Sequence, residues 1–71
     1  MDFYDAPENL KLLLENWNDF SPELQDHYKM MISSLLQMTN NMRSSYSTEE
    51  KQVISKLNDM WDDFNSYRME H

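Results

Sequence analysis

The stretch from Ser47 to Met69 has the clearest helical pattern of hydrophobic and polar positions in the chain. Its apolar residues, spaced by four, three, four and three positions, are Val53, Leu57, Met60, Phe64 and Tyr67. Because a helix turns by about 100° per residue, this spacing gathers them into one narrow stripe. Ile54 and Trp61 form a second row beside the stripe, and acidic residues occupy the opposite side. The pattern predicts an amphipathic helix over residues 47–69.

A second apolar seam predicts another long helix over residues 22–43. The seam has the alternating spacing of four and three of a coiled coil, and it consists of Leu24, Tyr28, Met31, Leu35, Met38 and Met42. Ile32 and Leu36 widen the apolar arc on one side, as a helix that contacts two others requires. Met30 falls outside the arc and is predicted to lie at the surface. We expect the seam to pack against the stripe of the helix over residues 47–69.

A shorter version of the same pattern predicts the first helix over residues 6–19. One face carries Leu10, Leu13, Leu14, Trp17 and Phe20. The spacing of Asp5 and Glu8 is that of a capping box, and Pro7 is tolerated only in a first turn. The residue before Pro22 is pushed out of helical geometry, so the first helix ends at or just before Phe20.

Short connections determine how the three predicted helices are arranged. Ser21 is a natural N-cap directly before Pro22, so the second helix begins almost where the first one ends. Ser47, with Glu50 three residues later, opens the third helix with a capping box. Two helices of matched length joined by a short loop form an antiparallel hairpin. We therefore expect an all-α fold, a small three-helix bundle in which a shorter first helix covers the long antiparallel hairpin of the second and third helices.

The composition favours one small helical domain over residues 1–71. The chain has no glycine, although sheets and tight hairpins usually need glycine-type turns. A single core at this size is marginal, because ordering costs roughly 1.5 kcal/mol per residue and apolar burial returns about as much. No cysteine is present to form a disulfide or a thiolate metal site. A homo-oligomer, or a fold completed on a partner, therefore stays open.

A second arrangement satisfies the same pattern. The hairpin of the second and third helices could pair with a second copy and form a four-helix dimer core. Leu36, Ile54 and Trp61 would then be the self-association residues, because the seam and the stripe do not include them. The corresponding function is a structural homo-oligomer with no separate ligand. The two arrangements differ in whether Trp61 is buried by its own chain or by another.

The formal net charge of −7 restricts the classes of partner. Such a chain repels nucleic-acid phosphates and anionic membranes, so we expect it to bind neither directly. It has no apolar run near the ~20 residues of a membrane span and no signal peptide, which predicts a cytoplasmic protein. The negative charge lies in residues 1–20 and 47–71, whereas residues 21–46 carry no net charge.

The chain offers little for catalysis, and we predict no enzyme, no cofactor and no metal site. His27 lies near Ser34 by helical position, but a helix surface supplies no oxyanion site. Asp59, Asp62 and Asp63 lie on the solvated side of one helix and not in a cleft, and the chain lacks the loop pattern of calcium sites. Phosphate-binding glycine loops and the HExxH motif are also missing from the sequence.

The acidic faces of the first and third helices are the best candidates for a functional surface. They carry Glu8, Leu12, Glu15 and Asp19 on the first helix and Asp59, Asp62 and Asp63 on the third. Leu12 is an apolar residue inside an acidic row, and interfaces typically have an apolar centre inside a polar rim. The alternative is a solvated face that only keeps the chain soluble. We predict that these residues bind a protein with a basic surface, as a mimic of the phosphate rows of DNA would also do.

Small size, acidity and missing catalytic residues resemble, as a broad type, the small regulators and inhibitors made by bacteria and their phages. This resemblance is one of kind and not of motif. We therefore expect a small acidic protein-binding module that regulates or inhibits a larger partner by docking on its surface.

Overall fold

A computed structural model of the chain describes residues 3–70, and the side chains of residues 3–67. Within these residues, α-helices alternate with short 3-10 turns. The elements in chain order are η1 (Phe3–Asp5), α1 (Ala6–Glu15), η2 (Trp17–Asp19), α2 (Pro22–Asn41), η3 (Arg43–Ser45) and α3 (Thr48–Glu70). The predicted all-α class is confirmed, and no strand occurs in the described part of the chain.

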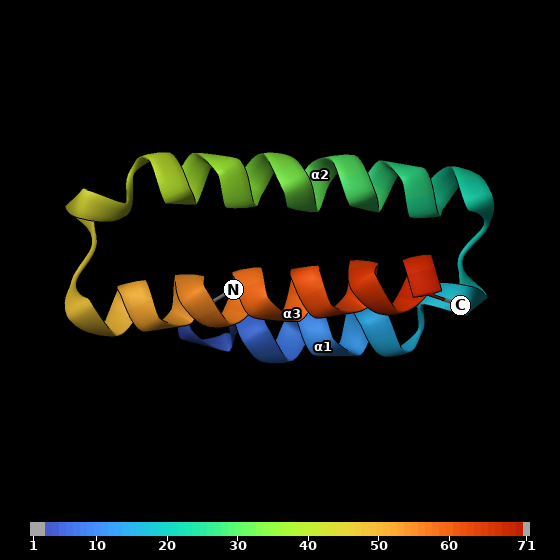
Figure 1. Cartoon of the computed structure of the whole chain (residues 1–71), viewed down its shortest axis with the longest axis horizontal. Helices are drawn as coiled ribbons and strands as arrows, with labels where there is room; N and C mark the ends of the chain where they lie inside the picture. Colours follow the sequence, from blue (N-terminus) through green and yellow to red (C-terminus); the bar gives the residue numbers. More distant parts are fainter. Residues whose placement is uncertain (1–2, 71) are drawn as a thin grey trace.

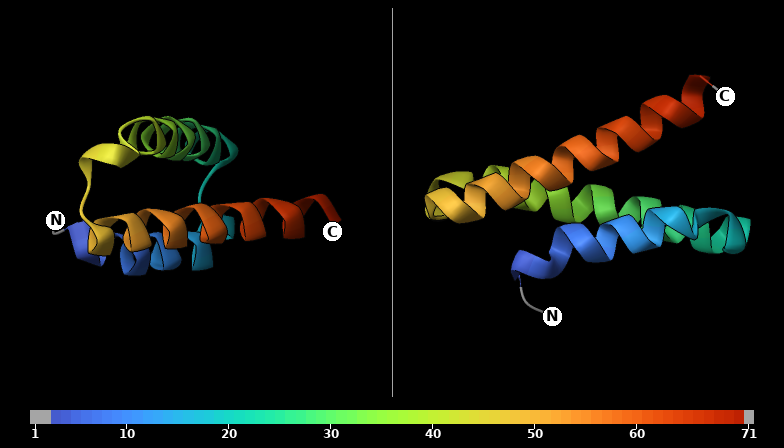
Figure 2. Two further views of the ribbon diagram at one scale, coloured as in Figure 1. Left: turned by 60° about the vertical axis from the view of Figure 1, so that its left-hand side comes forward. Right: turned by 90° about the horizontal axis from the view of Figure 1, so that it is seen from below.

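The helices form a three-helix bundle in which α3 is central. α2 and α3 run antiparallel along the long axis of the molecule, and the shorter α1 lies beside α3 (Figure 1). Figure 2 shows that α2 lies on one side of a layer formed by α3 and α1, and that the C-terminal half of α3 diverges from the other two helices when seen from below. α1 packs chiefly on α3, and few backbone contacts link α1 to α2. α1 therefore covers the hairpin from the α3 side and leaves much of α2 uncovered.

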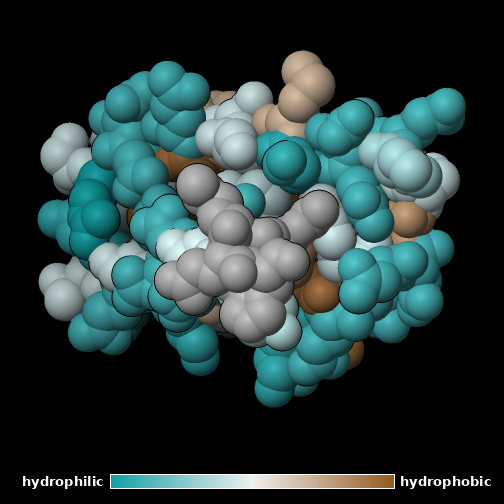
Figure 3. Space-filling view, turned by 45° about the vertical axis from the view of Figure 1, so that its right-hand side comes forward, coloured by the Kyte–Doolittle hydropathy of each residue, from teal (hydrophilic) through white to brown (hydrophobic). Residues whose placement is uncertain are grey.

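The core is small and draws on all three helices. Its buried side chains are those of Leu10, Trp17, Ile32, Leu36, Ile54 and Trp61. Trp17 joins the helices at one end of the bundle: its ring centroid lies 5.2 Å from that of Phe64 and 6.2 Å from that of Trp61. Tyr28 of α2 is 6.5 Å away on the other side. Hydrophilic side chains cover most of the face seen in Figure 3, where hydrophobic atoms appear only in small areas.

Most of the apolar seam predicted for α2 is exposed and not packed against α3; Tyr28 is the exception, because its ring centroid lies 5.1 Å from that of Phe20 and 6.5 Å from that of Trp17. The other seam residues expose between 40% and 54% of their surface at Leu24, Met31, Leu35, Met38 and Met42. Ile32 and Leu36, which were predicted only to widen the arc, are the buried residues of α2. The predicted packing of the seam is therefore wrong. The rotation of α2 about its own axis differs from the prediction: Ile32 and Leu36, and not the seam, face the other two helices.

Leu36, Ile54 and Trp61 are buried within a single chain. Trp61 packs against Trp17 and Phe64, with ring centroids 6.2 and 5.7 Å away. None of the three residues is available to a second copy in this conformation. Their predicted role in self-association therefore does not fit the fold, because the side of α3 that carries Ile54 and Trp61 is covered by the chain's own aromatic and aliphatic side chains.

Two of the three predicted helix caps are present. The backbone N–H of Glu50 donates to Ser47 Oγ at 3.2 Å, and the N–H of Ser47 donates to Glu50 Oε1 at 2.9 Å. The N–H of Leu24 donates to Ser21 Oγ at 3.3 Å. Asp5, in contrast, makes no side-chain cap hydrogen bond. The turn η1 runs straight into α1 and gives Asp5 helical dihedral angles, so the predicted capping box there is wrong.

The connection between α1 and α2 begins earlier than the sequence predicts. α1 ends at Glu15, and the side-chain amide of Asn16 donates to the carbonyl oxygen of Leu12 at 2.8 Å. The chain then tightens into η2, which carries the buried Trp17. Gln25 of α2 donates from Nε2 to the carbonyl oxygens of Trp17 and Phe20, at 2.9 and 3.2 Å. These bonds attach the start of α2 to the turn that places Trp17 in the core.

Polar side chains link α2 to α3 near the opposite end of the hairpin. The amides of Asn40 and Asn58 bond reciprocally, with Nδ2 to Oδ1 distances of 3.0 and 3.2 Å. Asn58 Nδ2 also donates to the carbonyl oxygen of Ile54 at 2.8 Å. One turn nearer the loop, Arg43 donates to Ser55 Oγ at 2.6 Å. These contacts help to fix the register of α2 on α3 beside the fully buried Ile54.

Replacing Trp17 with alanine should unfold most of the protein. Truncating a buried tryptophan costs about 3–5 kcal/mol, which approaches the whole stability of a chain of this size. The measurement is urea denaturation followed by far-ultraviolet circular dichroism. Leu12→Ala is the control, because an exposed side chain should change the free energy of unfolding by less than about 0.5 kcal/mol. Equal effects of the two substitutions would contradict the central position of Trp17.

The Asn40–Asn58 pair should show energetic coupling. A double-mutant cycle with Asn40→Ala and Asn58→Ala should give an interaction energy of about 0.5–1.5 kcal/mol, since each substitution leaves the other amide without its partner. Urea denaturation of the four proteins measures it. A cycle of Asn40→Ala with Asn65→Ala is the control and should be additive, because Asn65 donates to the carbonyl oxygen of Trp61 within α3.

Candidate functional site

A shallow depression lies along the line where α1 meets α3. It has a volume of about 660 Å³ and is lined by Pro7, Glu8, Lys11, Leu12, Glu15, Lys56 and Met60. We call these seven residues the Leu12 surface. Three members of the predicted acidic row, Glu8, Leu12 and Glu15, are thus brought together on one surface. Lys56 and Met60 of α3 complete it, so residues from two helices line this surface.

Leu12 is the apolar centre of this surface. Its side chain is 52% exposed, whereas the neighbouring α1 residue Leu10 is buried and Leu13 is half-buried. Met60 approaches from α3 and is partly buried. An apolar residue between two exposed glutamates, with a second apolar side chain beside it, has the composition of an interface centre inside a polar rim.

Two lysines in the Leu12 surface were missed by the sequence analysis. Lys11 could have been found, since it lies three residues after Glu8 and four before Glu15 and so shares their side of the helix. Lys56 comes from α3, and its presence depends on how α3 packs on α1. The two lysines balance the two glutamates of this surface, so the depression itself carries no net charge. The acidic character comes from the residues around it.

A second depression extends the Leu12 surface toward the start of α1. It has a volume of about 500 Å³ and shares Pro7, Glu8 and Lys56 with the first. It adds Tyr4 and Val53 as apolar groups and Glu49 as a third acidic one. The two depressions therefore form one continuous, uneven surface along the contact between α1 and α3. It covers about three turns of each helix.

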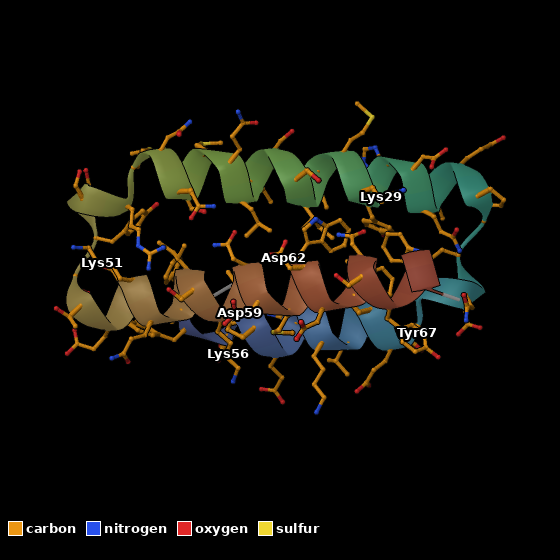
Figure 4. All side chains as sticks on the ribbon, in the orientation of Figure 1. Lys29, Lys51, Lys56, Asp59, Asp62 and Tyr67 are labelled. Carbon is orange, nitrogen blue, oxygen red and sulfur yellow. The ribbon has the colours of Figure 1, made fainter. Side chains whose placement is uncertain are left out.

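The aspartates of α3 divide between two sides of the helix. Asp59, Asp62 and Asp63 are all exposed. Figure 4 shows Asp59, like Lys56, on the side of α3 that adjoins α1, and Asp62 on the side toward α2. Asp63 lies one turn after Asp59 and so shares its side. Asp59 and Asp63 can therefore extend the rim of the Leu12 surface, and Asp62 points away from it.

Asp19 does not continue the row of Glu8, Leu12 and Glu15. It is exposed, but it lies in η2, beyond the end of α1 at Glu15. The prediction assumed regular helix to residue 19, and the 3-10 geometry of η2 changes the angle at which its side chains leave the chain. Asp19 is consequently outside the residues that line the Leu12 surface.

The candidate residues for metal or catalytic chemistry are exposed on the helices in the described part of the chain. No group of three or more histidine, aspartate or glutamate side chains in that part of the chain is placed to hold a metal ion. His27 and Ser34 are both exposed on α2. As far as the structure describes them, the helices also lack the combination of length and apolar character that crossing a bilayer requires.

Comparison with protein-family models, with curated proteins and with solved structures finds no match for this chain. A functional argument therefore has to start from the physical character of the surfaces themselves.

Proposed function

We propose that this protein is a non-catalytic binding module that regulates or inhibits a larger protein by docking through the Leu12 surface. The observation that carries this proposal is the half-exposed Leu12 side chain in a depression between α1 and α3, with carboxylates and lysines around it. A leucine that only kept a helix in place would turn inward, as Leu10 does.

The charge around the depression supports a partner with a basic rim. Glu49 lines the adjoining second depression, and Asp59 and Asp63 are exposed farther along α3, so three negative charges lie in the surroundings of a depression that is itself balanced. Rim charges of one sign attract a partner of the opposite sign and speed association. The apolar centre then provides the affinity, because it can be fully desolvated.

The same arrangement favours a partner that recognises a mixed apolar and charged surface over one that recognises an imitation of DNA. A DNA mimic needs regularly spaced negative charges without interruption, since a duplex presents one phosphate per 3.4 Å of each strand. Here Lys11, Leu12 and Lys56 interrupt the carboxylates. The partner that fits is a protein surface with an apolar pocket for Leu12, basic groups for the glutamates and acceptors for the lysines.

Leu12→Ala should weaken binding to the partner roughly 10- to 100-fold, since removing a leucine that is buried on binding costs about 1.5–3 kcal/mol. The partner would be captured from the native host on the immobilised chain and identified by mass spectrometry. Surface plasmon resonance would then compare the two proteins. Met30→Ala is the control, because Met30 is 73% exposed on α2, away from this surface. Equal loss in both variants, or no loss in Leu12→Ala, would refute the proposal.

Reversing the rim charges should slow association with that partner. A Glu8→Lys, Glu15→Lys double variant should lower the association rate constant about tenfold at low salt, and the difference should shrink at high salt. Stopped-flow or surface plasmon resonance over a series of salt concentrations measures this. The matched control is Glu23→Lys, Asp26→Lys on α2, which changes the net charge equally. A control variant that slowed association as much would mean that overall charge alone attracts the partner.

A further inference from the structure

The exposed seam of α2 is an apolar feature that the Leu12 surface does not use. Its half-exposed members are Leu24, Met31, Leu35, Met38 and Met42, with the partly buried Tyr28 in line. We call these six residues the α2 row. A continuous row of this length makes an apolar patch on the order of several hundred Å², a size that on soluble proteins usually marks an interface.

An apolar groove runs beside the α2 row. It lies between α1 and α2, has a volume of about 270 Å³ and is lined by Ala6, Asn9, Leu10, Leu13, Ile32, Leu35, Leu36 and Leu57. Leu35 belongs to both the groove and the row. Asn9 is the polar residue among these eight. A helix that covered the α2 row would also come to lie over this groove, so the two features fit one occupant.

We propose that the occupant is a second copy of this chain, with the two α2 helices packed antiparallel. The spacing of the α2 row reads the same from both ends. An antiparallel copy therefore sets Leu24 opposite the partner subunit's Met42, Tyr28 opposite the partner subunit's Met38, and Met31 opposite the partner subunit's Leu35. Every layer is apolar, and each pairs an a-type with a d-type position, as in antiparallel coiled coils.

The charge distribution favours a second copy over a basic or acidic partner. Residues 21–46 carry no net charge, whereas the segments with α1 and α3 are both negative. Pairing through α2 keeps the acidic helices of two chains, each of net charge −7, on the outside of the dimer. The positions that border the α2 row, His27, Ser34 and Asn41, are exposed and carry no formal charge. The formal charges of Glu23, Asp26 and Lys29 on α2 and of Arg43 just after it sum to zero, so this helix does not attract a partner of strong net charge of either sign.

The charges at the ends of α2 select the antiparallel direction. Glu23 lies at the start of α2 and Arg43 just after its end. A parallel pair would bring each of these side chains next to its own copy. An antiparallel pair brings Glu23 to the same end as the partner subunit's Arg43 and also opposes the two helix dipoles. With 20 residues, α2 is about 30 Å long, enough with the groove for an interface of roughly 800 Å² per chain.

Analytical ultracentrifugation of the full chain tests the dimer. The wild-type protein should sediment as a dimer at tens of micromolar, and Met38→Glu should raise the dissociation constant at least 100-fold. Met30→Glu is the matched control, because it places the same charge on an exposed methionine of the same helix outside the α2 row. Circular dichroism checks that both variants keep the helical content of the wild type. Leu12→Ala should leave the dimer intact, so this test is independent of the proposed partner.

Cysteine cross-linking tests the direction of the helices, since the chain has no cysteine of its own. Leu24 and Met42 are 18 residues apart, which is about 27 Å along a helix. Mixing Leu24→Cys with Met42→Cys under mild oxidation should give the disulfide-linked heterodimer, and each variant alone should stay largely un-cross-linked.

Three results would overturn the proposal. The first is a wild-type monomer at several hundred micromolar, which would assign the α2 row to a different partner. The second is a dimer that Met38→Glu weakens no more than Met30→Glu does. The third is efficient cross-linking of Leu24→Cys with itself, which would require parallel helices.

Discussion

The burial of Trp17 determines how the three helices are arranged. α1 ends at Glu15, and the following 3-10 turn directs the Trp17 indole between Trp61 and Phe64 of α3 and Tyr28 of α2. Because α1 is short and its end is held by this contact, α1 lies along α3. α2 is then covered by α3 on one side only. Most of the seam of α2 stays exposed in this arrangement.

The two candidate interfaces lie on different helices and differ in character. The Leu12 surface is a mixed-charge depression with an acidic surround, suited to a partner recognised by charge as well as shape. The α2 row is apolar, uncharged and rich in methionine, whose flexible side chain adapts to an opposing surface. The lining residues of the Leu12 surface belong to α1 and α3, and none belongs to α2. A dimer formed through α2 would therefore present two Leu12 surfaces, and a partner with two matching sites would bind it with higher avidity than one.

Much of the fold follows from the sequence because helix formation is local. The 3.6-residue period identifies all three helices, and Ser21 and Ser47 mark two of the starts correctly. Rotation of α2 about its axis could not be predicted in this way. Ile32 and Leu36 are as apolar as Leu35 and Met31, so the period alone gives two candidate faces, and the packing of α2 on the other two helices decides between them. In the candidate site, the helical period predicts that Glu8, Leu12 and Glu15 share one face, whereas the place of Lys56 depends on how α3 packs on α1. Outside the site, the Asn40–Asn58 pair likewise depends on the register of α2 on α3.

The small core explains why a coiled-coil-type seam is found outside it. Trp17 and Trp61, with Phe64 packed against them, fill the space between the helices at one end, and Leu10, Ile32 and Leu36 belong to the same cluster. A 71-residue chain has little interior beyond this, so a second full seam has no room inside. An exposed apolar seam lowers the solubility of the protein. Burial of the seam against a second copy would stabilise the fold, and this stabilisation would increase with protein concentration. The chain has no cysteine and so no disulfide to reinforce its core, and association is one route by which so small a core would gain stability.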